Sequence, residues 1–581
     1  MPKQWRIATY DTAVVERLAQ AAEVSELVAR LLVGRGIDCP DAARRFLQAK
    51  LTDLRDPSEL PGLTHAAELL HTAAKAGKRI VIYGDYDADG MTATAILLRC
   101  FRLLHAKVEY YVPHRLEEGY GLSNESLDEL ASRGAEVVVT VDNGIASLEQ
   151  ADHARQLGIE LVVTDHHQMA HRLPEAAAIV HPALPDFDYP FHGLCGAAVA
   201  FKLAWGICQL ASGGNRVQPA MRAFLLEATG LAAIGTIADV VPLVDENRAI
   251  VCNGLRSLSA SPSVGIAALK QITELDKKPF LAGDDVGFSI APRLNAAGRL
   301  GQADLAVELL STEDPKRAAE LARFIEELNS ERQHIERSVL LAARKQAKRQ
   351  FHPEQDPAFV LADFGWHAGV IGIVAGKLVE QYNRPVVLIS QDKLGIKPAM
   401  GSGRSIPGFD LHAAFAECSE HLLSHGGHAA AAGLKIADKS IDAFRQAFCA
   451  AAARRLADAA RDGQMDIDAE APFAALTRQT IEDIDKLAPF GCGNRRPVMC
   501  ASDVRIAGEP RLIGAAGRHV SLELEQHGVR LRAVAFGGGD WMDDFQAARN
   551  APISIAFHPV LNRFRGRVSV EMHLADWRRD D

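Results

Sequence analysis

The sequence predicts an α/β fold, with two α/β domains joined by a long helix and a C-terminal β-barrel domain of OB-like size. Three observations carry this prediction. Strand-like apolar runs alternate with helical segments, one long stretch is almost free of glycine and proline, and alternating short strands fill the end of the chain. With 581 residues, roughly three or four domains of about 100–200 residues are expected. Hydrophobic residues at 48% and charged residues at 24% exclude a fibrous or largely disordered chain.

The first α/β domain, a parallel-sheet domain, is expected over residues 51–313, after an N-terminal helical segment over residues 1–50. Its predicted strands are RIVIYG, VEYYVP, EVVVTVD, LVVTD and AAIVHP. The apolar-periodic stretches between them predict helices over residues 91–104, 124–133 and 147–157. Continuous apolar strands separated by helices are typical of a buried parallel sheet with right-handed crossovers. Residues 193–330 then follow a mainly helical pattern.

One long helix is predicted over residues 314–352, because this stretch is rich in helix formers and holds no glycine and no proline after Pro315. The second half of this helix is basic, with Glu336 as its one acid. Its basic residues are Arg332, Arg337, Arg344, Lys345, Lys348 and Arg349. A solvated helix face and a surface that faces nucleic acid both fit this pattern.

The second α/β domain is expected over residues 353–465, with the strands AFVLAD and PVVLIS on either side of a helix over 371–382. The pattern changes again in the last domain, over residues 466–581. There HVSLELEQ, RLRAVAFG, PISIAFHPV and RGRVSVEMHL alternate between polar and apolar residues, as half-buried antiparallel strands do. Their length and spacing predict a small barrel of the OB type, a fold that often binds nucleic acid.

The charge and cysteine content restrict the class of protein. The net charge is −10, which disfavours a protein that coats nucleic acid over its whole surface. It still allows a local basic groove and carboxylates gathered around metal ions. The nine cysteines form no CxxC pair, so we expect reduced thiols of a cytoplasmic protein and no zinc ribbon. We expect no signal peptide and no membrane span.

Acidic residues and histidines follow the predicted strands of the first domain. They are Asp85, Asp87 and Asp89 in GDYDADG, Asp142 in TVDNG, Asp165, His166 and His167 in TDHH, and Asp239 in GTIADVVPL. Because the carboxyl ends of parallel strands lie at one edge of a sheet, the strand-end residues are expected to converge. A lone aspartate after a strand is commonly a helix N-cap, but that explanation does not cover the whole set.

Carboxylates with one or two imidazoles suit Mn²⁺ or Mg²⁺, and the number of ligands suits two divalent cations. Two such ions about 3.5–4 Å apart can activate a water and stabilise the leaving oxygen of a phosphodiester. GDYDADG also resembles a calcium-binding loop. That loop needs a glutamate at its twelfth position, where this chain has Ile96, so calcium binding of this type is disfavoured.

The four motifs GDYDADG, TVDNG, TDHH and IADVVPL resemble, in this order, those of the DHH phosphoesterase superfamily. GSGRS at 401–405 and GGHAAAAG at 426–433 resemble its DHHA1 domain. With PHRLEEGYGLS, APRLNAAGRLG and the β-rich C-terminal domain, the resemblance narrows to the RecJ family of bacterial single-strand-specific DNA exonucleases. It covers about residues 75 to 580.

The resemblance implies roles for individual residues. Asp87, Asp89, Asp142, His166 and Asp239 would be metal ligands. Asp85 and His167 would belong to the same catalytic site, as ligands or as groups that hold them, and His428 would lie near the phosphate that is cleaved. Arg115, Ser402 and Arg404 match positions that bind the terminal phosphate, and Tyr120 matches a position that stacks on a base. Arg293, Asn295 and Arg299 would neutralise phosphates or support the metal site; pairing with nearby acids is the alternative for these arginines.

The resemblance further implies 5′ to 3′ degradation of single-stranded DNA to 5′-mononucleotides by two-metal hydrolysis, in DNA repair and recombination. The expected partners are single-stranded DNA with a 5′ end and, as the family suggests, single-strand-binding protein and a helicase. No nucleophilic Ser or Cys constellation accompanies the motifs, so we expect no covalent enzyme intermediate. Two alternatives stay open: a phosphodiesterase or pyrophosphatase for smaller substrates, and a nucleic-acid-binding scaffold without activity.

Overall fold

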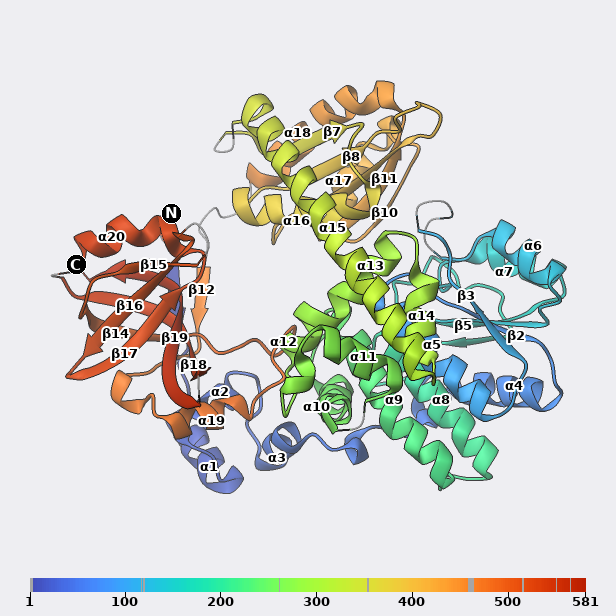
Figure 1. Cartoon of the computed structure of the whole chain (residues 1–581), viewed down its shortest axis with the longest axis horizontal. Helices are drawn as coiled ribbons and strands as arrows, with labels where there is room; N and C mark the ends of the chain where they lie inside the picture. The colour runs from blue at the N-terminus through green and yellow to red at the C-terminus, as the bar shows by residue number, and fades with distance from the viewer. Residues whose placement is uncertain are drawn as a thin grey trace. The chain divides into compact units, whose positions relative to one another are not determined.

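A computed structural model describes residues 4–115, 118, 121–260, 262–352, 355–457, 464–514, 517–549, 551–564 and 566–580. The chain divides into two compact units (Figure 1). The larger unit contains Asp56–Asp239 and Gly254–Ala460. The smaller unit contains Met1–Arg55, Val240–Asn253 and Arg461–Asp581, so it gathers segments from both ends of the chain.

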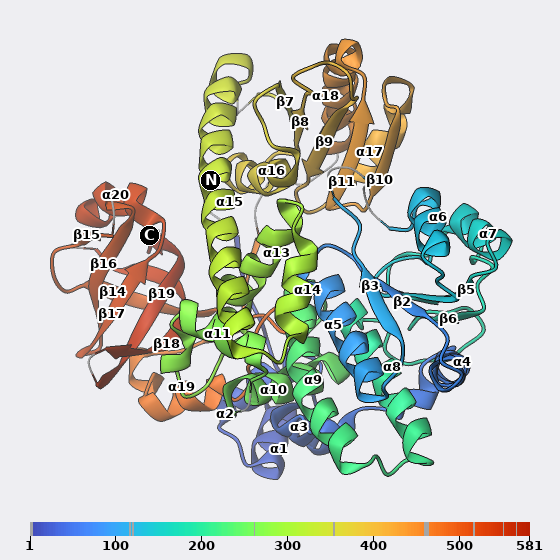
Figure 2. The same ribbon diagram turned by 45° about the vertical axis from the view of Figure 1, so that its right-hand side comes forward.

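The first sheet of the larger unit has five parallel strands in the order β3-β2-β4-β5-β6. The strands are β2 (Ile80–Tyr83), β3 (Val108–Tyr111), β4 (Val137–Thr140), β5 (Glu160–Thr164) and β6 (Ala178–Val180). The helices of this layer are α4 (Leu63–Lys75), α5 (Ala88–Leu103), α6 (Asn124–Ser132) and α7 (Leu148–Gln156). Helices α6 and α7 cover one face of the sheet (Figure 2). The predicted buried parallel sheet is confirmed, since every residue of β2 and β4 is buried.

A helical layer follows the sheet. It contains α8 (Gly196–Ser212), α9 (Pro219–Ala238), α11 (Val264–Ile272), α13 (Ala291–Arg299) and α14 (Ala303–Ser311), while α10 (Asp245–Ala260) belongs to the smaller unit up to Asn253 and to the larger unit from Gly254. Helix α5 packs against α8, α9 and α14. By length and composition α9 could cross a membrane, although the sequence predicted no membrane span. In this structure 61% of its apolar window is buried inside the protein.

The long helix is α15 (Pro315–Gln350), confirmed almost to the residue. Asp314 caps its N-terminus by accepting a hydrogen bond from the backbone N–H of Lys316, and Pro315 occupies the first helical position. The first half of α15 packs on α11, α13 and α14, and the second half packs on α16.

The second sheet has the order β10-β11-β9-β8-β7 and is mixed, because only β7 and β8 are parallel. Its strands are β7 (Phe359–Asp363), β8 (Val386–Ser390), β9 (Ala399–Arg404), β10 (Ser424–Gly427) and β11 (Ala431–Ile436). Its helices are α16 (Ala368–Tyr382), α17 (Leu411–Glu417) and α18 (Ile441–Ala457). One apolar core joins α17 and α18 to the sheet, and a second joins α15 and α16 to it.

The smaller unit contains a seven-stranded sheet in the order β13-β14-β18-β19-β17-β16-β15, and β14 also pairs with β16. Its strands are β13 (Ala469–Glu470), β14 (Met499–Ile506), β15 (Arg511–Ile513), β16 (His519–Gln526), β17 (Val529–Ala535), β18 (Ile553–Phe564) and β19 (Arg567–Arg579). The helices α19 (Arg478–Asp485) and α20 (Met542–Ala547) accompany it. The predicted β-rich C-terminal domain is present, and its closure into a barrel stays a prediction.

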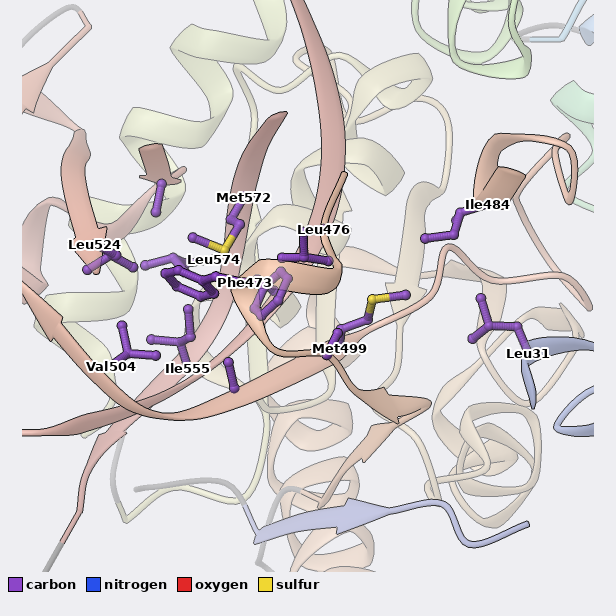
Figure 3. Close-up of a cluster of buried hydrophobic side chains, with 14 of the residues drawn as sticks. Leu31, Phe473, Leu476, Ile484, Met499, Val504, Leu524, Ile555, Met572 and Leu574 are labelled. Atoms are coloured by element: carbon purple, nitrogen blue, oxygen red, sulfur yellow. The ribbon is translucent and has the colours of Figure 1, made fainter. Parts of the chain in front are cut away.

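The N-terminal segment packs with the C-terminal domain inside the smaller unit. Strand β1 (Gln4–Ile7) pairs in parallel with β12 (Gln464–Ile467), and Trp5 Nε1 donates to Asp576 Oδ2 at 2.8 Å. The helices α1 (Thr12–Ala22), α2 (Glu26–Val33) and α3 (Pro40–Gln48) share an apolar core with the sheet. Figure 3 shows part of this core, from Leu31 of α2 to Met572 of β19.

Candidate metal centre

Seven predicted residues lie together in the larger unit, at one edge of its first sheet. They are Asp85, Asp87 and Asp89 after β2, Asp142 after β4, His166 and His167 after β5, and Asp239 at the C-terminal end of α9. Asp87 also caps α5, because its Oδ1 accepts hydrogen bonds from the backbone N–H groups of Asp89 and Gly90 at 2.9 and 3.1 Å. Asp87 therefore both caps α5 and belongs to the site.

The side chains form three overlapping groups whose potential ligand atoms lie within 4.8 Å of one another. The groups are Asp85, Asp87 and Asp142; Asp89, His166 and Asp239; and Asp142, His166 and His167. His166 Nε2 is the common point, at 3.0 Å from Asp142 Oδ1, 3.6 Å from Asp239 Oδ2 and 3.9 Å from Asp89 Oδ2. Because Asp142 and His166 each belong to two groups, the arrangement can hold two adjacent cations.

Burial and mutual repulsion disfavour the charged forms of these carboxylates. Asp85, Asp89 and Asp142 are each 1–2% exposed. Burial and then Asp87 raise the pKa of Asp89 to about 6, and burial with Asp89 raises the pKa of Asp239 to about 8. The pKa values of Asp85 and Asp142 are raised for the same two reasons. Such crowding is costly unless cations neutralise the charge.

One further observation supports divalent cations as the occupants of this set of carboxylates and imidazoles. The Oδ1 atom of Asp85 is buried and accepts no hydrogen bond from any residue that the structure describes. A buried carboxylate oxygen without a donor needs another positive partner. Burial and then His167 lower the pKa of His166 to about 3, so its imidazole is neutral, which is the form that binds a metal.

Asp165 holds the second histidine of the pair. Its Oδ1 accepts hydrogen bonds from His167 Nδ1 at 2.7 Å and from the backbone N–H groups of His166 and His167 at 2.7 and 3.1 Å. Its Oδ2 accepts from the backbone N–H of Ile145 at 3.0 Å. Although burial lowers the pKa of His167, the bond to Asp165 raises it to about 9. Asp165 therefore fixes the ring orientation and ring proton of His167.

The start of α8 contributes to the site, which the sequence analysis missed. The backbone N–H groups of Gly196 and Ala197 donate to the two carboxylate oxygens of Asp89 at 2.7 and 2.9 Å. A Cβ atom at Gly196 would meet Asp142 Oδ1 at 2.5 Å, and one at Gly235 would meet Asp89 Oδ1 at 2.3 Å. The glycines at these two helix positions are the only local signal for this close approach.

A second group of predicted residues is basic and spans both sheets of the larger unit. Arg404 Nη1 donates to Ser402 Oγ at 3.2 Å, and the Arg115 guanidinium lies 4.7 Å from the centre of the Tyr86 ring. Burial lowers the pKa of Arg404, and Arg115 lowers it further. Burial, followed by Arg115 and Arg404, lowers the pKa of Arg299 to about 10. Three guanidinium groups thus lie within electrostatic reach of one another, an arrangement that an anion stabilises.

The remaining predicted residues take different positions. Asn295 Oδ1 accepts from the backbone N–H of Ala88 at 2.9 Å and so supports the loop of the metal site. Arg293 pairs with Glu326 of α15, the alternative considered for these arginines. His428 is exposed at the end of β10, within electrostatic reach of His166. Tyr120 lies outside the described residues.

Comparisons with known proteins agree with this architecture. The family model of the DHH family, N-terminal domain matches residues 79–236, the DHHA1 domain model matches residues 355–454, and the RecJ OB domain model matches residues 467–576. The single-stranded-DNA-specific exonuclease RecJ of Bacillus subtilis is 36% identical over 576 residues, which cover 99% of this chain and 70% of that protein.

Two solved structures of RecJ from Thermus thermophilus are similar along the whole chain. The complex with Mn²⁺ has a TM-score of 0.83, and the complex with Mg²⁺ has a TM-score of 0.77; both are 31% identical. They cover 100% of this chain, which corresponds to 80% and 79% of theirs. The motifs, the domain order and these similarities lead to one conclusion: the chain belongs to the RecJ family of single-stranded-DNA-specific exonucleases.

Proposed function

We propose that this chain is a metal-dependent exonuclease that degrades single-stranded DNA from its 5′ end to 5′-mononucleotides. The observation that carries the proposal is the partly buried cluster of five aspartates and two histidines, in a chain that belongs to the RecJ family. Asp87, Asp89, Asp142, His166 and Asp239 would hold two divalent cations, Mn²⁺ or Mg²⁺, with Asp85 and His167 in the same site. When bound, these cations would activate water and stabilise the leaving oxygen of the phosphodiester.

The surrounding groups have separate roles in this proposal. The backbone N–H groups at the start of α8 fix both oxygens of Asp89, and Asp165 fixes the ring of His167. The side chains of Asp89 and His167 are therefore held in place before substrate arrives, which reduces the free-energy cost of ordering the site during the reaction. His428 would contact the phosphate that is cleaved, since it lies close enough to influence the pKa of His166.

The 5′ polarity would follow from the basic group. Arg115, Ser402 and Arg404 would bind the terminal 5′-phosphate, and Arg299 would add positive charge behind them. Two features support this assignment: Arg404 and Ser402 already share a hydrogen bond, and the buried guanidinium groups are destabilised without an anion. Tyr120 would stack on a base near this phosphate.

The wider role is also part of the proposal. The OB-type domain would bind nucleotides downstream of the cleaved bond, as OB folds do through basic and aromatic side chains. We propose a cytoplasmic enzyme of DNA repair and recombination, with single-strand-binding protein and a helicase as partners.

The test is degradation of matched 5′-tailed, 3′-tailed and blunt duplex DNA with Mn²⁺ or Mg²⁺ present. Mononucleotide release from the 5′-tailed substrate alone is expected. Asp142→Ala should bind single-stranded DNA but release no mononucleotides, because Asp142 belongs to two of the three ligand groups. Asp128→Ala, which changes an exposed aspartate paired with His153, is the matched control. Activity confined to dinucleotides would favour the smaller-substrate alternative, and a wild-type rate for Asp142→Ala would refute the assigned site.

A further inference from the structure

The second half of α15 carries a row of exposed basic side chains, which we call the basic stripe: Arg337, Arg344, Lys345, Lys348 and Arg349. Positions 337, 341, 344, 345 and 348 recur at the three- and four-residue spacing that places side chains on one helix face. Leu341, in the middle of this row, is 73% exposed. The face is therefore open to solvent along its length.

The two halves of α15 differ in how their charges are balanced. Before Arg337, two arginines of α15 have acidic partners: Arg317 pairs with Glu308 at 2.6 Å, and Arg332 pairs with Glu336 at 2.5 Å. Glu336 is buried and also pairs with Lys377 of α16, so it points away from the stripe. No residue of the basic stripe forms an ion pair with any acid in the described part of the chain. The stripe thus presents five positive charges that have no acidic ion-pair partner among the described residues, on a protein whose net charge is −10.

The opposite face of the same helix segment is fixed to the second sheet. Val339, Ala343 and Ala347 are buried in the core that α15 shares with α16, β7 and β8. Arg332, five residues before the stripe and turned inward, lies within electrostatic reach of Arg299 in the basic group near the metal centre. The basic stripe therefore lies on the face of α15 opposite the face that packs on α16 and the second sheet.

We propose that the basic stripe docks the sugar–phosphate backbone of duplex DNA next to the single strand that is being degraded. From Arg337 to Arg349 the helix rises about 18 Å at about 1.5 Å per residue. About five phosphates of one duplex strand span that length at about 3.4 Å each, which matches the five cations. Single-strand sites combine charge with aromatic stacking, but residues 337–349 contain no Phe, Tyr or Trp. A straight row of cations without aromatics suits a rigid duplex backbone.

The test compares Arg344→Ala/Lys348→Ala with Arg454→Ala/Arg455→Ala. The control pair is on another helix, α18, and is already neutralised by Glu417. Alanine keeps the helix propensity in both variants. Binding to a 5′-tailed duplex and to the tail alone is measured over a range of salt concentrations without divalent cations, so that no hydrolysis is expected. For the tailed duplex, the slope of log K against log[salt] should fall by about 1.8 for the stripe variant, at about 0.9 per phosphate contact.

The outcomes separate this proposal from the exonuclease assignment on which its DNA ligand rests. An unchanged slope for the tailed duplex would overturn the docking surface, leaving an acidic protein as the partner to test. An equal fall of the slope for the single-stranded tail alone would show that the basic stripe does not select duplex DNA. The stripe variant should degrade a short single-stranded oligonucleotide at the wild-type rate. If no form of the protein degrades it, the exonuclease proposal fails, while the binding slopes still report on the basic stripe.

Discussion

Replacing Asp165 by asparagine tests whether His167 acts through a fixed orientation. Asp165 is about 1% exposed, and its two oxygens accept four hydrogen bonds, at 2.7, 2.7, 3.0 and 3.1 Å. Asparagine has one acceptor oxygen, so if that oxygen keeps its bonds to His166 and His167, its NH₂ group faces the N–H of Ile145. The lost charge and the unsatisfied donor each weaken the positioning of His167. Changes to residues that orient metal ligands lower metal affinity by about 10–100-fold, which is about 1.4–2.7 kcal/mol.

The measurement is the Mn²⁺ affinity of the purified protein by isothermal titration calorimetry, with single-strand degradation as the second readout. Asp128→Asn is the matched control, because Asp128 also pairs with a histidine, His153, at 2.8 Å, but on the exposed surface of α6 and α7. The control should bind Mn²⁺ as the wild type does. Thermal unfolding without metal checks that Asp165→Asn is folded. A folded Asp165→Asn protein whose Mn²⁺ affinity is within twofold of the wild type would refute the reasoning.

Two further predictions concern packing. Gly235→Ala places a Cβ atom 2.3 Å from Asp89 Oδ1 and 2.5 Å from Ala197 Cβ, so α8 and α9 must separate. We expect a loss of about 1–3 kcal/mol in unfolding free energy and weaker Mn²⁺ binding. The control is Gly287→Ala, whose new Cβ atom would meet its nearest neighbour at 3.5 Å, and it should change neither quantity. Arg248→Met removes donors to the carbonyl oxygens of Phe46, Leu487 and Ala488 at 2.6–2.9 Å in the smaller unit. A loss of roughly 3–5 kcal/mol is expected in urea denaturation, because buried carbonyls lose their donor, and a change below about 1 kcal/mol would contradict this account.

Several features could be predicted because the signal is local. The β-branched runs before Asp85, Asp142 and His166 identify strands, and parallel strands bring their carboxyl ends to one edge. The convergence of these residues follows from that rule alone, although they are up to 81 positions apart in sequence. The helix α15 could be predicted for a similar reason, since its composition and its Asp–Pro start act over a few residues.

Other features depend on contacts between distant segments and leave little trace in the sequence. The hydrogen bonds from the start of α8 to Asp89 join residues more than 100 positions apart. Likewise, Trp5 and Asp576 are 571 positions apart, and neither residue has a pattern that indicates the other. The motif around Arg293 predicts a phosphate-binding residue. Its pairing with Glu326 depends on the packing of α13 on α15, which the motif does not indicate.

The sequence by itself determined the order of domains, the parallel sheet and the set of acids and histidines at its edge, because strand periodicity and motif spacing are properties of short segments. Only the tertiary structure decided which groups hold those side chains, how the N-terminal helices join the C-terminal domain, and which charges of α15 are already paired. These depend on how helices pack over long sequence separations, where one glycine or one buried ion pair sets the distance between elements. The basic stripe illustrates the difference: its charges are evident in the sequence, but their lack of acidic partners in the described part of the chain is a property of the fold.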